Sequence, residues 1–339
     1  MIVDRPGPAY FDATHGTWVL SRFVDVHRAL RDPQLVVHGT SATSRSVHLE
    51  VRRAAAAMLS REQMSEWRTA MATHATRLVQ SLPTDREVDL RGALFEPWTR
   101  ALTLRVTGVP NAQADECLHL ARTVFLSAAS ASDGAPRPDG QRAAAALASL
   151  LALRTVTANP AADVQTLVAV SQSLPALLAS VTRALLQDAT QLTALRHDVV
   201  HDTVAWPTVV AELLRFASPA RAVFRVAASD HQIAEAAIRT GDPVALILSA
   251  ANRDPSQFTA PDELDLRRDA VSQLALGAGT HRCSGTTLVH LAVEVATDAL
   301  LRHAASVHLA DDAASRISWI GGFATRAPAV LPVRIGRQA

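Results

Sequence analysis

The sequence LALGAGTHRCSG at residues 274–285 decides the fold. It contains Cys283, one of two cysteines in a chain of 339 residues, and a strongly apolar segment follows at 286–304 that we expect to be helical. Three glycines surround the cysteine, namely Gly277, Gly279 and Gly285. Unpaired N–H groups and the dipole at a helix N-terminus should lower the pKa of the Cys283 thiol. Glycine tolerates positive φ and lets a flat group approach closely.

Cys283 could have a role different from that of a reactive thiolate, and three such roles compete. A lone free cysteine is usually a small buried hydrophobe. A zinc site needs about four ligands, and the chain has no Cys-x-x-Cys. A dinucleotide loop needs Gly-x-Gly-x-x-Gly, but here the third glycine falls six residues after the second. The dense Gly-x-Gly-x-His-x-Cys-x-Gly spacing is more specific than these, and a thiolate open to a flat partner matches an axial haem ligand.

The composition indicates the class of protein. The 33 basic residues balance the 32 acidic ones, so nothing points to nucleic acid or an anionic membrane as partner. The N-terminus lacks a signal-peptide pattern, no uninterrupted apolar run suggests a transmembrane helix, and two cysteines make no disulfide framework. Every basic residue is arginine and alanine is abundant, which is typical of a GC-rich bacterial coding sequence. We expect a cytoplasmic protein.

Most of the chain has helical periodicity, and the β part is small. Apolar periodicity predicts a strand and helix over 18–35, two helices over 48–82 broken near Ser60, a helix from 95 to Gly108, and helices over 144–156, 163–189 (kinked at Pro175), 206–219 and 286–304. Turn residues predict a loop at 130–141, a small sheet within 221–251 and a hairpin at 319–336. The prediction is a mainly α protein with a minor β part, forming one domain over residues 1–339.

The cysteine loop resembles the haem-binding signature of cytochrome P-450, the family of haem-thiolate monooxygenases. Leu276 stands where the family has Phe, at a position that packs beside the cysteine. The resemblance implies the P-450 fold, a triangular helical domain with minor sheets. It also implies haem b (iron protoporphyrin IX) as cofactor, with Cys283 as the proximal iron ligand and the three glycines of the loop beside the haem.

Further segments match the family in the expected order. Glu212 and Arg215 resemble its structural Glu-x-x-Arg pair; the family's third network residue is usually Arg, but the matching stretch here offers Glu263. The resemblance also implies partners for the two haem propionates. These are His48, Arg52, Arg225 and His281.

The distal helix departs from the family pattern Ala-Gly-x-Asp/Glu-Thr. Val170 stands at the glycine, Gln172 at the acid and Ser173 at the threonine, so the resemblance assigns Ser173 and Gln172 to proton delivery. Gln172 cannot shuttle a proton as a carboxylate does. The B–C region between Pro33 and the helix at 48, and the F–G/H region before the distal helix, are both short, which predicts an open, shallow pocket.

The sequence is compatible with three functions. The first is a bacterial monooxygenase of secondary metabolism that takes electrons from a separate ferredoxin and ferredoxin reductase, since the chain has no flavin or iron–sulfur motif. The second is a haem-thiolate enzyme of non-hydroxylating chemistry: peroxide-dependent oxidation, cyclisation, rearrangement or dehydration. The third is a haem protein that only binds a partner. The open pocket would suit a small-molecule or carrier-bound substrate.

Overall fold

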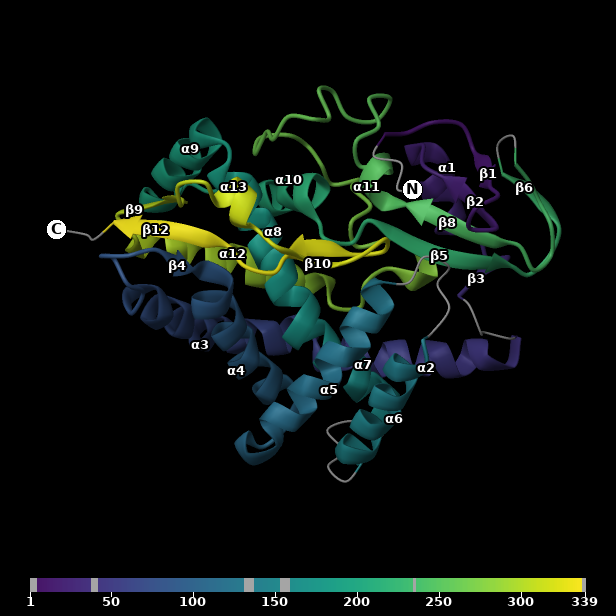
Figure 1. Ribbon diagram of the computed structural model, residues 1–339, viewed down its shortest axis with the longest axis horizontal. Coiled ribbons are helices and arrows are strands. Elements are labelled where there is room, and N and C mark those ends of the chain that lie inside the picture. The colour runs from purple at the N-terminus through teal and green to yellow at the C-terminus, as the bar shows by residue number, and fades with distance from the viewer. Residues whose placement is uncertain (1–4, 38–41, 131–136, 153–158, 234–235, 337–339) are drawn as a thin grey trace.

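The computed structural model describes residues 5–37, 42–130, 137–152, 159–233 and 236–336, except for the side chains of 42–48, 61 and 314. Helices make up the larger part of the molecule, and the strands run in a band across it, with helices above and below them (Figure 1). The α-helices are α1 Phe23–Ala29, α2 Ala42–Met58, α3 Arg61–Gln80, α4 Glu96–Thr107, α5 Asn111–Ala129, α6 Pro138–Ala152, α7 Pro160–Val168, α8 Leu174–Leu186, α9 Ala189–Val200, α10 Trp206–Ala217, α11 Leu248–Ala251, α12 Thr286–His303 and α13 Ala313–Arg316. Two π-helical turns, η1 Arg91–Phe95 and η2 Ala169–Ser173, and the 3-10 turn η3 Gly279–His281 complete the helical part.

The strands form two small sheets and two hairpins in the described residues. They are β1 Tyr10–Asp12, β2 Thr17–Leu20, β3 Leu35–Val36, β4 Val88–Asp89, β5 Ala222–Ala227, β6 His231–Ile233, β7 Ala236–Ile238, β8 Pro243–Ile247, β9 Ser306–Leu309, β10 Trp319–Gly321, β11 Arg326–Pro328 and β12 Pro332–Gly336. The larger sheet has the order β1-β2-β8-β5-β3, and the smaller one has the order β4-β12-β9. β2 runs parallel to β8, with Trp18 opposite Val244, and the remaining pairs in these sheets are antiparallel. The predicted sheet within 221–251 and the predicted hairpin at the C-terminal end are therefore confirmed.

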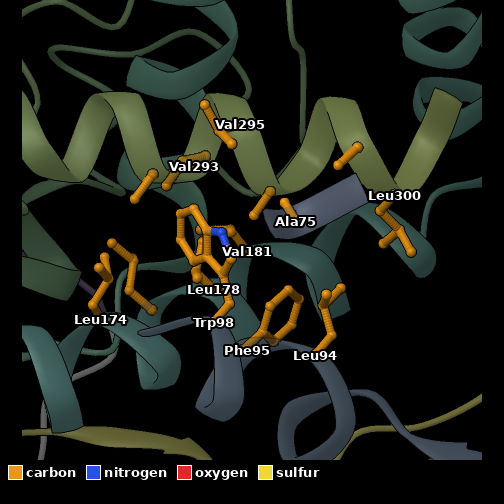
Figure 2. Packing of buried hydrophobic residues seen from close by; sticks show 14 of the residues in the cluster. Ala75, Leu94, Phe95, Trp98, Leu174, Leu178, Val181, Val293, Val295 and Leu300 are labelled. Carbon is orange, nitrogen blue, oxygen red and sulfur yellow. The ribbon is translucent and has the colours of Figure 1, made fainter. Parts of the chain in front are cut away.

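The main core lies where α3, α4, α8 and α12 meet, and Figure 2 shows the side chains packed there. Trp98 is its largest fully buried side chain, and the indole N–H donates to the carbonyl of Met71 at 3.0 Å. Leu178 and Val181 of α8 and Val293 of α12 are buried in the same cluster (Figure 2). A buried aromatic needs a partner for its polar atom, and the α3 carbonyl supplies it.

The long segment 163–189 is not one α-helix as predicted. It begins earlier, at Pro160, and the π turn η2 separates α7 from α8 directly before Pro175. Proline lacks the N–H that an α-helical ladder needs, so a register change at this point is physically reasonable. The stretch from 160 to 186 is long and apolar enough to cross a membrane, but 61% of its most apolar window is buried inside the protein, as in a core helix.

Three further boundaries were predicted with mixed success. The break near Ser60 is confirmed, because its side chain caps α3 by accepting from the N–H of Gln63 at 3.3 Å. Gly108 ends α4 in the left-handed conformation, with φ of +63°. The predicted loop at 130–141 is partly wrong, because α6 already begins at Pro138, where a missing N–H costs a helix nothing; residues 131–136 lie outside the described part.

Candidate active site

A mostly apolar pocket of about 350 Å³ surrounds the cysteine loop. Val170 of η2 and Leu174 and Leu177 of α8 contribute to its lining. Leu276 and the start of α12 contribute from the segment that carries the cysteine. The dimensions and the apolar walls are those of a small-molecule or cofactor site.

Backbone hydrogen bonds hold the cysteine loop in place. The N–H of Cys283 donates to the carbonyl of Leu276 at 2.8 Å, and the Thr286 hydroxyl donates to the carbonyl of Cys283 at 2.7 Å. Gly277 and Gly279 adopt φ of +70° and +65°, so the loop needs residues that tolerate the left-handed region. The loop is therefore a preformed turn that presents the sulfur to the pocket.

Cys283 lines this pocket and is exposed there. Desolvation by the protein nevertheless raises the pKa of the thiol above its ordinary value; the Gly285 N–H and the guanidinium groups of Arg52 and Arg282 oppose the rise. The lowered pKa expected from the sequence is thus wrong for the protein alone. The expected hydrogen bond and cations at the helix N-terminus are present, but desolvation raises the pKa of the thiol more than these groups lower it.

Two of the four predicted propionate partners are cationic side chains at this pocket. Arg52 and Arg225 both line it, and the guanidinium of Arg52 donates to the carbonyl of Arg282. Burial, followed by repulsion from Arg52, lowers the pKa of Arg225 to about 10. The Nε of Arg225 is buried and has no hydrogen-bond partner among the described residues. A buried donor of this kind is expected to meet an anion or acceptor that the pocket takes up.

The two histidines predicted to join these arginines have different placements. His281 lines the pocket together with Cys283. His48 lies on α2, but its side chain is outside the described part of the structure.

The two predicted distal residues point to different cavities. Ser173 lines the cysteine pocket. Gln172 instead lines a separate cavity with His119 and Arg122, and its amide donates to the hydroxyl of Ser171 at 3.3 Å. The π turn therefore leaves Ser173 beside the pocket and places the residue before it in a different cavity.

Glu212 and Arg215 form a fully buried ion pair on α10. The guanidinium donates to the carboxylate at 2.6 Å from Nε and 2.8 Å from Nη2. Arg268 is the third member, with its Nε donating to Glu212 at 3.1 Å. Glu263, which the sequence offered for this role, contributes only its carbonyl, which accepts from Arg215 at 3.1 Å. The third residue is an arginine after all, five positions further along the irregular segment.

This network connects α10 to the segment that leads to the cysteine. Arg215 donates to the carbonyl of Asn252 at 2.8 Å, and the Asn252 side chain accepts from the N–H of Leu274 at 2.7 Å. Asn252 is itself 1% exposed. The pair predicted to be structural therefore lies two hydrogen bonds away from the loop that carries Cys283.

Comparison with known proteins agrees with this geometry. Residues 198–312 match the sequence profile of the cytochrome P-450 family. The chain is 41% identical over 135 residues to a biotin-biosynthesis cytochrome P-450 of Bacillus subtilis, which is 40% of this chain and 33% of the relative. It is 36% identical over 137 residues to 6-deoxyerythronolide B hydroxylase of Saccharopolyspora erythraea, again 40% of this chain and 34% of the relative. The matched part spans about a third of the length of these curated relatives.

Solved structures extend the likeness to the whole fold. A P-450 in complex with acyl carrier protein that carries hexadec-9Z-enoic acid superposes with a TM-score of 0.81 and 22% identity, covering 97% of this chain and 94% of that one. A ligand-free P-450 of Mycobacterium smegmatis gives a TM-score of 0.83 at 20% identity, covering 96% and 93%. Residues 198–312 match the cytochrome P-450 family, and nearly the whole chain has the fold of its members. The predicted fold is thereby confirmed.

The match to the cytochrome P-450 family implies a haem cofactor, and the residues around the pocket fit one. A thiol faces an apolar pocket, as an iron ligand beside a porphyrin requires. Arg225 lines the pocket and has a buried Nε without a hydrogen-bond partner among the described residues, and Arg52 lies close enough to depress the pKa of Arg225.

Proposed function

We propose that this P-450 is a haem-thiolate oxidoreductase in which Cys283 binds the iron of haem b, and that residues 1–339 form one haem-binding unit in the cytoplasm. The observation that carries the proposal is the Cys283 side chain at an apolar pocket that the buried Arg225 and the half-buried Arg52 also line. The relatives named above are a biosynthetic P-450 and a hydroxylase, which supports a bacterial monooxygenase that tailors a secondary metabolite.

The side chains of this protein would divide the work as follows. Cys283 would hold the iron, and the Gly285 N–H would stabilise the thiolate. Arg52 and Arg225 would pair with the propionates, joined by His281 and His48. The haem, when bound, supplies the oxygen chemistry, and the electron-rich thiolate favours O–O cleavage.

On the distal side, Ser173 offers a hydroxyl at the pocket that can hold and pass a proton. The apolar walls from η2 and α8 would orient the substrate and limit water. Electrons would come from a ferredoxin and its reductase. A small molecule or a carrier-bound acyl chain would be the substrate, and the structural relative bound to acyl carrier protein supports the second of these.

One spectrum tests the iron ligand. The reduced protein under carbon monoxide should show the Soret band of a thiolate-bound haem, and Cys283→Ala should lose it. Cys117→Ala is the matched control, because Cys117 is 2% exposed in a separate apolar cluster and should leave the band in place. A wild-type spectrum without the thiolate signature, or a Cys283→Ala spectrum that keeps it, would refute the assignment.

A second function is favoured by the placement of Gln172. Gln172 stands where the family has the acid and lines a different cavity from Ser173, and none of the described residues that line the cysteine pocket is an aspartate or a glutamate. Non-hydroxylating chemistry, such as peroxide-dependent oxidation or cyclisation, would not need that proton route. Turnover with reductase and NAD(P)H supports the monooxygenase, whereas turnover only with peroxide, or with neither, supports the alternative. Tight complex formation with no turnover under any of these conditions would indicate a haem protein that only binds a partner.

A further inference from the structure

A second cavity, away from the cysteine loop, is lined by four arginines. It has a volume of about 380 Å³ and lies between the C-terminal half of α8, the end of α10 and the β10–β11 hairpin (Figure 1). The four are Arg183, Arg221, Arg253 and Arg326. None of the described residues that line it is an aspartate or a glutamate. The nearly neutral chain thus collects positive charge at one place.

Two of these guanidinium groups share one tryptophan. Arg183 of α8 lies 5.1 Å from the centre of the Trp319 ring, and Arg326 of β11 lies 4.4 Å from it. Contact with an indole ring favours a cation and restricts its orientation. The two cations are therefore held near each other without a carboxylate in the cavity between them.

The hairpin that carries Arg326 is fixed to the segment after α10. The N–H of Arg326 donates to the carbonyl of Pro219 at 2.9 Å, and the N–H of Arg221 donates to the carbonyl of Ala324 at 2.8 Å. Ala220 and Thr325 form a bridge between the same two segments. The positions of these arginines thus follow from the backbone and do not depend on flexible side chains alone.

Arg183 and Arg253 differ in how their charge is compensated. Arg253 donates to Asp262 at 3.0 Å and to the carbonyl of Phe216 at 3.0 Å, so it has its own acid. The Nε of Arg183 is buried and has no hydrogen-bond partner among the described residues. Desolvation, followed by repulsion from Arg326, lowers the pKa of the Arg183 guanidinium. A buried donor beside a second cation is stabilised when an anion supplies the missing partner.

We propose that this cavity binds a phosphate group, with Arg183 and Arg326 donating to its oxygens. A phosphate carries close to two negative charges and several acceptor oxygens, so it can bridge two guanidinium forks and compensate both charges, whereas a carboxylate brings only one negative charge. The cavity has room for more than the phosphate, and Trp319 and Phe216 border it. The site therefore suits the phosphate end of a small organic ester as well as the free ion.

Isothermal titration of the full haem-loaded chain at constant ionic strength tests the site with three probes: inorganic phosphate, phenyl phosphate and benzoate. We expect 1:1 binding of both phosphates, and weaker binding of benzoate. Tighter binding of phenyl phosphate than of inorganic phosphate would identify an organic ester as the natural ligand, and equal or weaker binding would identify the free ion. Benzoate that binds as well as the phosphates would overturn the phosphate assignment.

Matched variants locate the binding. Arg183→Gln and Arg326→Gln should each weaken phosphate binding at least about tenfold, because each removes one charged fork. Arg105→Gln is the control, since Arg105 also lies over a tryptophan, 5.7 Å from the Trp67 ring, but does not line this cavity. If Arg183→Gln unfolds, Arg326→Gln still decides, because Arg326 is the exposed residue of β11. No binding by the wild type at about 10 mM phosphate, or equal losses in Arg105→Gln, would overturn the proposal.

Discussion

Removal of the Glu212 carboxylate should destabilise this protein more than removal of a side chain that leaves the carboxylate paired. Glu212 has no exposed surface and accepts from Arg215 at 2.6 and 2.8 Å, from Arg268 at 3.1 Å, and from the N–H of Asp265 at 3.0 Å. In Glu212→Gln, two guanidinium groups stay in place around a neutral amide. The Arg215 side chain has no exposed surface, so water cannot replace the lost charge.

The magnitudes follow from which charge is left unpaired. Breaking a buried pair from one side costs about 3–5 kcal/mol, and we expect Glu212→Gln to fall in that range. In Arg268→Met the carboxylate keeps both bonds from Arg215 and the backbone N–H. The carboxylate loses one charge-assisted hydrogen bond, and the other bonds of Arg268, to the carbonyls of Thr259, Ala260 and Glu263, lie at exposed positions, so the expected cost is about 1.5–3 kcal/mol.

Urea unfolding of the haem-loaded proteins, followed by far-UV circular dichroism, compares their stabilities. A shift of the unfolding midpoint, at an unchanged dependence of the unfolding free energy on urea concentration, gives the loss of stability. Arg302→Met is the matched control. Arg302 also pairs with two carboxylates, those of Asp298 and Asp202, but at the surface, where ion pairs contribute little. A Glu212→Gln protein no less stable than Arg302→Met would refute the reasoning. Equal losses in Glu212→Gln and Arg268→Met would show that the unpaired cations are not the cause.

Three further predictions concern the cysteine loop, the pocket and the surface. In thermal unfolding, Gly279→Ala should lower the stability more than Gly277→Ala. Both glycines have positive φ, which costs a residue with a side chain about 1–2 kcal/mol. At Gly279 an added Cβ would also meet a backbone oxygen at 2.7 Å, whereas the nearest backbone oxygen at Gly277 is 3.7 Å away. Arg225→Gln should weaken haem binding about tenfold or more in a transfer assay with apomyoglobin, because a buried cation that faces the pocket is lost, and unchanged affinity would exclude it as a propionate partner. Hydrogen bonds from Thr240 lower the pKa of Asp230 to about 2. The contribution of Asp230 to stability is therefore complete above about pH 4 and is lost as the pH falls through about 2. The stability difference between wild type and Asp230→Asn should shrink over that interval, and a difference that grows instead would contradict the assignment.

The sequence was sufficient for features that depend on local pattern. Apolar periodicity located α12, α10 and the helices around Ser60, and glycine and proline marked the turns between the strands. These signals are local because a helix or turn is specified by residues a few positions apart. Pro175 indicated a disturbance of the helix over 163–189, but nothing local indicated that it takes the form of the π turn η2, since a change from one helical register to another leaves the apolar pattern nearly intact.

Features that depend on the tertiary fold could not be predicted in the same way. Arg268 meets Glu212 across 56 positions of sequence, and the irregular segment between them offers no periodicity that would place it. The predicted direction of the Cys283 pKa shift was wrong for a related reason. The helix terminus and nearby cations were visible in the sequence, but the extent of burial is a property of the whole pocket, and burial is the largest cause.

Hydrogen bonds connect the ion-pair network to the cysteine loop, and this connection gives the network a role in cofactor binding as well as in stability. Arg215 binds the carbonyl of Asn252, whose side chain binds the N–H of Leu274, the first residue of the loop sequence. Two residues further on, the carbonyl of Leu276 accepts from the N–H of Cys283. A loosened network would therefore move the sulfur before it unfolded the protein, because each connection in this series is a single hydrogen bond. Glu212 and Arg215 need no contact with the reacting atoms for this role, since their contribution is to keep the proposed iron ligand at a fixed position.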